Sequence, residues 1–196
     1  FYYDGKYGNG MLYKLILPDT LCYVMPNAFS TGGSWFDGLA AVQLPQNPRL
    51  VIGEGAFYCC RKMEKAILPS GLKKLNRFAF DCGENLKEII LPDSLEEMSD
   101  NCISGTFEEL IIPGKVKTIP EEAIFQSEID RLIISEGVEK LESNAFRRIG
   151  GMGRGVKAIS LPKSIKKIAK DAIGGYDLYI YYAGTQNDRA KINNKD

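Results

Sequence analysis

The sequence predicts a solenoid, in which similar short windings stack side by side and each buries a narrow slab of core against the next. Three observations predict this fold: one apolar pattern occurs seven times, a second pattern alternates with it, and the two stay in phase through most of the 196 residues. A marker position of the first pattern falls at Val24, Ile52, Leu75, Met98, Ile119, Leu141 and Ile168, in steps of 28, 23, 23, 21, 22 and 27 residues.

The first pattern reads apolar-x-x-apolar-x-x-x-small-apolar, as in Leu72, Leu75, Ala79 and Phe80. Its small residue, which is alanine or cysteine, allows neighbouring backbones to approach. The phenylalanine or isoleucine that follows is large enough to fill the winding, and its burial is a substantial apolar contribution. We therefore expect this segment to form the side of the solenoid that lies opposite the sheet.

The second pattern reads apolar-x-x-apolar-x-apolar-Pro, as in Leu86, Ile89, Leu91 and Pro92. The alternation at its end predicts a short strand, and proline stops the hydrogen bonding because it has no N–H. Since Ser135 replaces the proline in one copy only, the strand ends at nearly the same point in each winding. Strands stacked winding after winding predict a parallel β-sheet.

Several units carry both patterns at a fixed spacing. Residues 56–69 read Ala-Phe-x-x-Cys-x-x-Met-x-x-Ala-x-Leu-Pro, residues 79–95 repeat the arrangement, and residues 180–185 close the array with Ile-Tyr-Tyr-Ala-Gly-Thr. Over about residues 12–185 the chain resembles BspA-type leucine-rich repeats.

This resemblance implies a leucine-rich-repeat solenoid, a right-handed coil with a parallel β-sheet on one face and short strands or helical turns on the other. It implies a single domain over residues 1–196, with an N-terminal cap at 1–11, about seven to eight repeats at 12–175, and a C-terminal cap and tail at 176–196. The family occurs on bacterial surface and secreted proteins, some of them adhesins. The chain begins at Phe1 without a visible leader, so we expect either that a leader was removed or that the chain was cut from a longer protein. The resemblance implies a location at the cell surface or secretion.

Composition excludes several functions. Lys+Arg and Asp+Glu each total 25, and this balance argues against nucleic acid as a partner. The chain has no histidine, so it can hold neither a Ser-His-Asp nor a Cys-His catalytic group, nor a histidine-ligated zinc. The apolar runs are too short to span a bilayer, and we expect no membrane insertion.

Catalysis is not expected from the remaining residues. The acidic pairs, such as Glu96-Glu97 and Glu121-Glu122, lie in repeat turns or flanks, where charge maintains solubility. The five cysteines lack the spacing of a metal site, and we interpret them as small, buried, free thiols. The sequence therefore predicts no metal site and no cofactor.

The strand pattern predicts two rows of outward side chains beside the inward positions. One row contains an isoleucine in four consecutive windings, which we call the isoleucine stripe: Ile67, Ile90, Ile111 and Ile133. The adjacent charged row contains Lys65, Glu88, Glu109 and Arg131. An exposed apolar strip usually marks a contact site, here for another protein or a second copy. Alternatively, a ladder of β-branched residues stabilises the sheet and nothing else.

Further contact candidates lie away from the strands. Trp35 and Phe36 occupy the long step between the first two windings, and they are either a loop contact or fold back over the first winding. Tyrosines cluster near both ends, where they suit a cap or a glycan-stacking surface. We therefore interpret the chain as a non-enzymatic binding module for protein–protein interaction or adhesion; the alternatives are a structural spacer without its own ligand and a glycan-binding surface.

Overall fold

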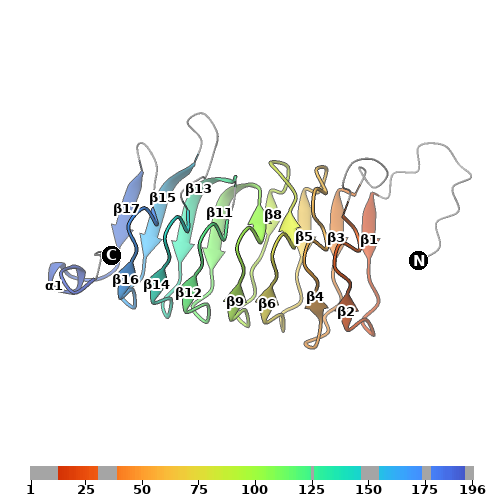
Figure 1. The fold of residues 1–196 in the computed structure, drawn as a ribbon, viewed down its shortest axis with the longest axis horizontal. Helices are drawn as coiled ribbons and strands as arrows, with labels where there is room; N and C mark the ends of the chain where they lie inside the picture. Colours follow the sequence, from red (N-terminus) through yellow and green to blue (C-terminus); the bar gives the residue numbers. More distant parts are fainter. Residues whose placement is uncertain (1–12, 31–38, 125, 147–154, 174–177, 193–196) are drawn as a thin grey trace, which may run out of the picture.

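The computed structural model describes residues 13–30, 39–124, 126–146, 155–173 and 178–192. It confirms the predicted leucine-rich-repeat solenoid with parallel strands (Figure 1). Each coil contributes one strand to a broad sheet and, except in the last coil, then one to a narrow sheet on another side. The predicted N-terminal cap at residues 1–11 lies outside the described residues.

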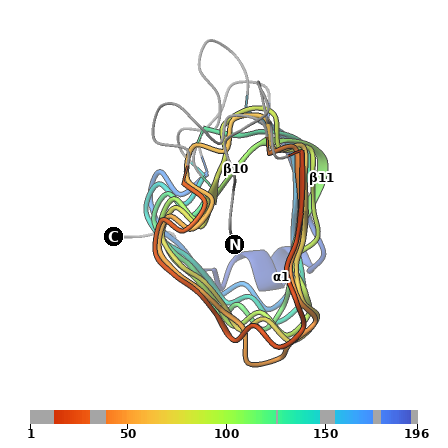
Figure 2. The same ribbon diagram turned by 90° about the vertical axis from the view of Figure 1, so that its right-hand side faces the viewer.

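The broad sheet forms in two sections of four parallel strands. Its strands are β1 (Lys14–Ile16), β3 (Ala41–Gln43), β5 (Lys65–Ile67) and β8 (Glu88–Ile89), followed by β11 (Thr106–Ile112), β13 (Glu128–Ile134), β15 (Val156–Leu161) and β17 (Tyr179–Tyr182). Viewed along the solenoid axis, the coils nearly superpose, and the broad sheet forms their straight right-hand side (Figure 2).

The narrow sheet consists of two-residue strands in three separate groups. They are β2 (Tyr23–Val24) with β4 (Val51–Ile52), β6 (Lys74–Leu75) with β9 (Glu97–Met98), and β12 (Thr118–Ile119) with β14 (Lys140–Leu141) and β16 (Lys167–Ile168). A third wall contains the pair β7 (Phe80–Asp81) and β10 (Ile103–Ser104). Short strands and turns thus form the side opposite the broad sheet.

Helix is confined to α1 (Gln186–Arg189) among the described residues, a helix that the sequence patterns did not predict. Thr185 caps it, because its hydroxyl accepts a hydrogen bond from the Asp188 N–H while the Asp188 carboxylate accepts one from the Thr185 N–H. The Thr-x-x-Asp spacing is the sequence signal for this start. Ile192, just after the helix, packs against the core.

The strand register aligns equivalent residues of successive coils. In the first section Leu15 pairs with Val42, and Val42 with Ala66; in the second Leu110 pairs with Leu132, and Leu132 with Ile159. All of these side chains are buried. The inward row predicted from the second pattern is therefore confirmed.

Aromatic side chains of the first pattern stack through the interior. The ring centroids of Phe29 and Phe57 lie 5.3 Å apart, and those of Phe57 and Phe80 lie 5.1 Å apart. Ile103 and Ile124 continue this column, and Phe146 follows, also buried. One hydrophobic cluster extends through all the coils. This agrees with the prediction that each winding buries its core against the next.

Every coil turns a corner in the left-handed backbone region, three residues after its marker position. The corner residues are Asn27, Gly55, Phe78, Asn101, Glu122, Asn144 and Asp171, with φ between 49° and 62°. Only one of them is glycine, and asparagine or aspartate tolerates this conformation better than most residues. The corners recur in the same steps as the markers, so backbone geometry repeats with the sequence.

The cysteines only partly match the prediction. All five are free thiols, and Cys60, Cys82 and Cys102 are buried. The expectation of burial is wrong for Cys22, which is exposed, and for Cys59, which is half-buried at a φ of 59°. Cys22 lies just before β2 and Cys59 lies in a turn, and neither occupies an inward position of the repeat pattern.

We expect Phe80→Ala to lower the free energy of unfolding by about 3–5 kcal/mol, because Phe80 is fully buried and its removal leaves a cavity within the stack. Denaturant unfolding followed by circular dichroism measures this loss. A loss below about 1 kcal/mol would contradict the account of a tightly packed aromatic column.

Candidate interaction surface

The broad sheet presents the isoleucine stripe on its outer face. Ile67 is 40% exposed, Ile90 is 73% exposed and Ile111 is 46% exposed, and Ile133 is half-buried. Ile111 pairs directly with Ile133 across β11 and β13. The residues directly before and after each isoleucine along the chain are buried, so the alternation of side chains along the strand determines which of them reach the surface.

The charged row lies beside this stripe and forms two ion pairs. Lys65 Nζ lies 2.5 Å from Glu88 Oε1, and Arg131 Nη2 lies 3.0 Å from Glu109 Oε2. All four side chains are at least one-third exposed, so each pair contributes little to stability. Their order along the row is positive, negative, negative, positive, which gives the surface a defined charge pattern.

A shallow groove lies at the N-terminal half of the stripe. Its apolar lining comes from Ile67, Ile90 and Pro92, and the Lys65–Glu88 ion pair lies along it. Its polar lining, which the sequence patterns did not identify, comes from Gln46, Ser70 and Asp93. These residues lie in the turns just after the strands, where three successive coils bring them together.

Both outward rows continue beyond the predicted stripe. Ile16 is 58% exposed at one end, and Tyr179 and Tyr181 are exposed on β17 at the other. The expectation that tyrosines cover the end of the core is wrong for Tyr179 and Tyr181, because their register with Ala158 and Ser160 directs them outward. Tyr182 alternates inward and packs against the core.

Trp35 and Phe36, the predicted loop contacts, belong to residues 31–38 and lie outside the described residues. They stay predictions.

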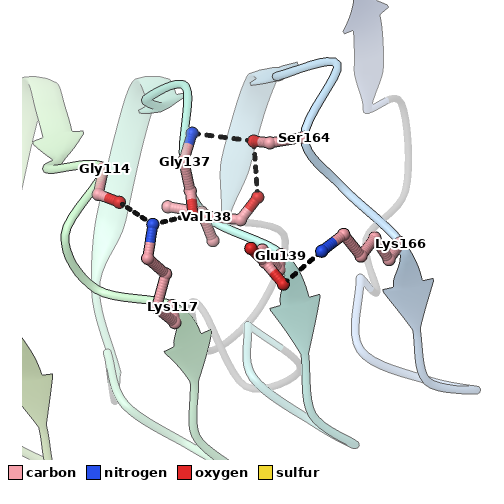
Figure 3. A network of polar contacts seen from close by, with 7 residues as sticks. All are labelled: Gly114, Lys117, Gly137, Val138, Glu139, Ser164 and Lys166. Carbon is pink, nitrogen blue, oxygen red and sulfur yellow. Dashed lines mark hydrogen bonds and ion pairs between the residues drawn. The ribbon is translucent and has the colours of Figure 1, made fainter.

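A polar network joins the turns below the second section of the broad sheet (Figure 3). Lys117 Nζ donates to the carbonyls of Gly114 at 3.3 Å and Gly137 at 3.0 Å. Ser164 Oγ accepts from the Gly137 N–H and donates to the Val138 carbonyl. The groups bond to one another, so the network holds three turns in place.

An ion pair extends this network on the narrow sheet side. Lys166 Nζ lies 2.6 Å from Glu139 Oε2, and this hydrogen bond is the main cause that lowers the pKa of the Glu139 carboxyl. Both side chains are exposed, so the pair orders the surface without anchoring the core.

Replacing Gly137 by alanine should destabilise the protein strongly. Gly137 has a φ of 109°, and a Cβ there would lie 2.4 Å from the Gly114 carbonyl oxygen. Gly83 is the matched control, because it also has a positive φ but nothing within 4 Å of its Cβ position. We expect Gly83→Ala to cost about 1–2 kcal/mol and Gly137→Ala to cost more. Equal losses in chemical denaturation would contradict the close contact between the turns.

The third wall, which contains β7 and β10, holds several buried polar contacts. Ser104, which is fully buried, donates a hydrogen bond of 2.7 Å from its Oγ to Asp81 Oδ1 and accepts one from the Gly83 N–H. Burial raises the pKa of Asp81, and the Ser104 hydroxyl offsets part of that rise. Ser127 Oγ accepts from the Gly105 N–H in the same wall. These contacts tie neighbouring coils together.

The raised pKa of Asp81 predicts a pH-dependent effect of Asp81→Asn. The pKa of the Asp81 carboxyl is higher in the folded protein than in the unfolded chain, so ionisation of this carboxyl opposes folding. The penalty appears as the pH rises through the window between these two pKa values. The variant should therefore gain stability relative to the wild type as pH rises from below that window to neutral. Denaturant unfolding at several pH values measures the difference; a difference independent of pH would contradict it.

The described residues show no cluster of three or more Cys, Asp or Glu suited to a metal ion. Burial raises the pKa of the Cys60 thiol to about 12, so this thiol is not an activated nucleophile at neutral pH. Cys82 and Cys102 are buried more deeply, and their pKa values are raised for the same reason. No described helix is long and apolar enough to cross a membrane.

The repeat geometry agrees with a comparison at the sequence level. The family model for the BspA type leucine-rich repeat region matches residues 6–106 and 34–152, with six copies. The chain belongs to this family. Leucine-rich repeats of this kind generally mediate protein interactions and are generally not enzymes. No curated protein matches the chain.

Two solved structures are similar to this BspA-type chain. A leucine-rich repeat protein from Bacteroides ovatus is 22% identical with a TM-score of 0.61, over 90% of this chain and 49% of that protein. A leucine rich cell surface protein from Faecalibacterium prausnitzii is 19% identical with a TM-score of 0.43, over 95% of this chain and 36% of that one. The chain thus spans half or less of each, and the first similarity shows the shared fold.

Proposed function

We propose that this chain is a non-enzymatic binding module of a cell-surface or secreted protein, and that it uses the outer face of the broad sheet for protein–protein interaction or adhesion. The observation that carries the proposal is the isoleucine stripe, because four consecutive coils place an isoleucine at the same outward position. The charged row beside it supplies a polar margin. An apolar centre with a polar rim is the usual anatomy of a protein interface.

The sheet itself does not require isoleucine at these positions. Gln43 pairs with Ile67, and Ser160 pairs with Ile133, in the same row of adjacent coils. Both polar residues lie within regular strands, so stabilisation of the ladder is an insufficient reason for the stripe. Ile90 is the clearest case, because this residue is 73% exposed and its side chain gains little from its neighbours.

Protein fits this face better than glycan. Glycan recognition commonly stacks sugar rings on aromatic faces, whereas the stripe is aliphatic and the residues that line the groove include no aromatic side chain. The aromatic side chains on this face, Tyr179 and Tyr181, lie on β17 beyond the stripe. A glycan-binding role would therefore use the end of the sheet, away from the groove. Location at the cell surface is supported by membership of the family.

The double substitution Ile90→Asp and Ile111→Asp tests the proposal. We expect at least about a tenfold loss of affinity for purified host matrix proteins, or of self-association, because two charges would enter an apolar contact. Binding is measured by surface plasmon resonance and self-association by sedimentation velocity. Thermal unfolding should change little, since Ile90 is 73% and Ile111 46% exposed and neither side chain belongs to the buried core.

Ile16→Asp is the matched control. Ile16 occupies the same row and is 58% exposed, but Gln43 separates it from the stripe. The control should bind as the wild type does. Unchanged behaviour of the double variant in every assay would favour a spacer without a ligand, and binding on glycan arrays that survives the double substitution would favour the tyrosine end.

A further inference from the structure

Both sheets are interrupted at one junction between coils. The broad sheet ends at β8 and starts again at β11, and the narrow sheet ends at β9 and starts again at β12. The narrow sheet also ends at β4, but there the broad sheet continues from β3 to β5. Within the described ranges, the junction between the β8–β9 coil and the β11–β12 coil is therefore the place where neither sheet connects neighbours.

Pro120 gives a chemical cause for the interruption of the narrow sheet. In four other coils the residue after the marker donates its backbone N–H to the preceding coil: Gly53 to Val24 at 2.8 Å, Ser99 to Leu75 at 2.9 Å, Glu142 to Ile119 at 3.0 Å and Ala169 to Leu141 at 3.0 Å. At the other break of the narrow sheet, Asn76 reaches the Ile52 carbonyl through its side-chain amide at 2.7 Å. Pro120 occupies this position after Ile119 and has no N–H. The equivalent bond to Met98 cannot form.

Side-chain ion pairs also stop at this junction. On one side, four pairs join the β8–β9 coil to the preceding coil: Lys65–Glu88, Lys73–Glu96, Lys74–Glu97 and Arg77–Asp100. On the other side, three pairs join later coils: Glu109–Arg131, Asp130–Lys157 and Glu139–Lys166. No ion pair between described residues crosses the junction. Across it, Glu88 and Glu109 are like charges at equivalent positions of the same row. The hydrogen bond from Lys73 is the main cause that lowers the pKa of the Glu96 carboxyl, and Lys115 across the junction is close enough to help lower it without forming an ion pair.

One wall holds the two coils together. The Thr106 backbone N–H donates to the Leu86 carbonyl at 2.8 Å, and the Asn101 backbone N–H donates to the Glu122 carbonyl at 2.8 Å. Gly105 lies so close to this contact that a Cβ would be 2.4 Å from the Leu86 oxygen. The hydrophobic core also continues through the junction. Backbone bonds therefore fix one side of the junction, while the two sheet sides rest on apolar packing.

We propose that this junction is a hinge, and that the solenoid consists of two stiff bodies that bend about the wall containing Leu86, Gly105 and Thr106. Apolar packing is non-directional and tolerates small rotations better than a ladder of hydrogen bonds does. Bending about this wall changes the separation of β8 and β11 on the broad face. The inference does not depend on the proposed function.

The hinge divides the isoleucine stripe at its centre. Ile67 and Ile90 belong to the first body with the Lys65–Glu88 pair, and Ile111 and Ile133 belong to the second with the Glu109–Arg131 pair. Each body thus carries half of the stripe and its own ion pair. A contact surface of two such halves adjusts its curvature to the partner.

Residual dipolar couplings of the backbone amides in the full chain test the hinge, because they report the orientation and order of each segment. We fit couplings from residues 39–100 and from residues 106–146 separately and together. The expected result is that each segment fits its own alignment tensor, that the two tensors differ in magnitude, and that a joint fit fails. A single tensor that fits both segments would overturn the proposal.

Two controls make the comparison specific. Residues 39–52 and 63–100, which the continuous broad sheet connects, should share one tensor. The variant Cys22→Ser, Ile90→Cys, Ile111→Cys introduces a disulfide across the junction; its oxidised form should fit one tensor over both bodies, and its reduced form should not. Identical couplings in the oxidised and reduced forms would also overturn the hinge.

Discussion

Contact between successive coils is the constraint on which this structure depends. A single coil buries one face of its core only when the next coil covers it, and the same contact pairs its backbone groups with those of the neighbour. The stacked rings of Phe29, Phe57 and Phe80 and the parallel strand register are two expressions of this one requirement. A surface that repeats along the axis follows directly, since each coil presents equivalent residues at equivalent positions.

The sequence was sufficient to predict the strands, the inward row and the aromatic column, because these features depend on apolar spacing alone. The corners were less accessible, since Phe78 and Glu122 are not residues whose identity indicates a positive φ. The exposure of Cys22 was missed because cysteine was expected to be buried, although this residue lies at a variable position of the first pattern, between Leu21 and Val24. Helix α1 depends on one local capping interaction and leaves no periodic signal.

The candidate surface was predictable as rows of side chains but not as a shape. Strand alternation identifies Ile90 and Glu88 as outward residues. The groove also needs Gln46, Ser70 and Asp93, which come from turns of three different coils and meet only through stacking. Likewise, Pro120 is visible in the sequence, but its effect on the ladder requires knowledge of which N–H groups cross between coils.

The corners also determine where the coil length varies. From the central inward residue of the broad strand to the marker the spacing is 9 residues in every coil but one, as from Leu110 to Ile119, and the corner always follows three residues later. The interval from the corner to the next inward residue, however, ranges from 9, as from Asn101 to Leu110, to 15, as from Asn144 to Ile159. Insertions and deletions are thus concentrated at one rim, which evolution can lengthen or trim while the strands of both sheets keep their spacing.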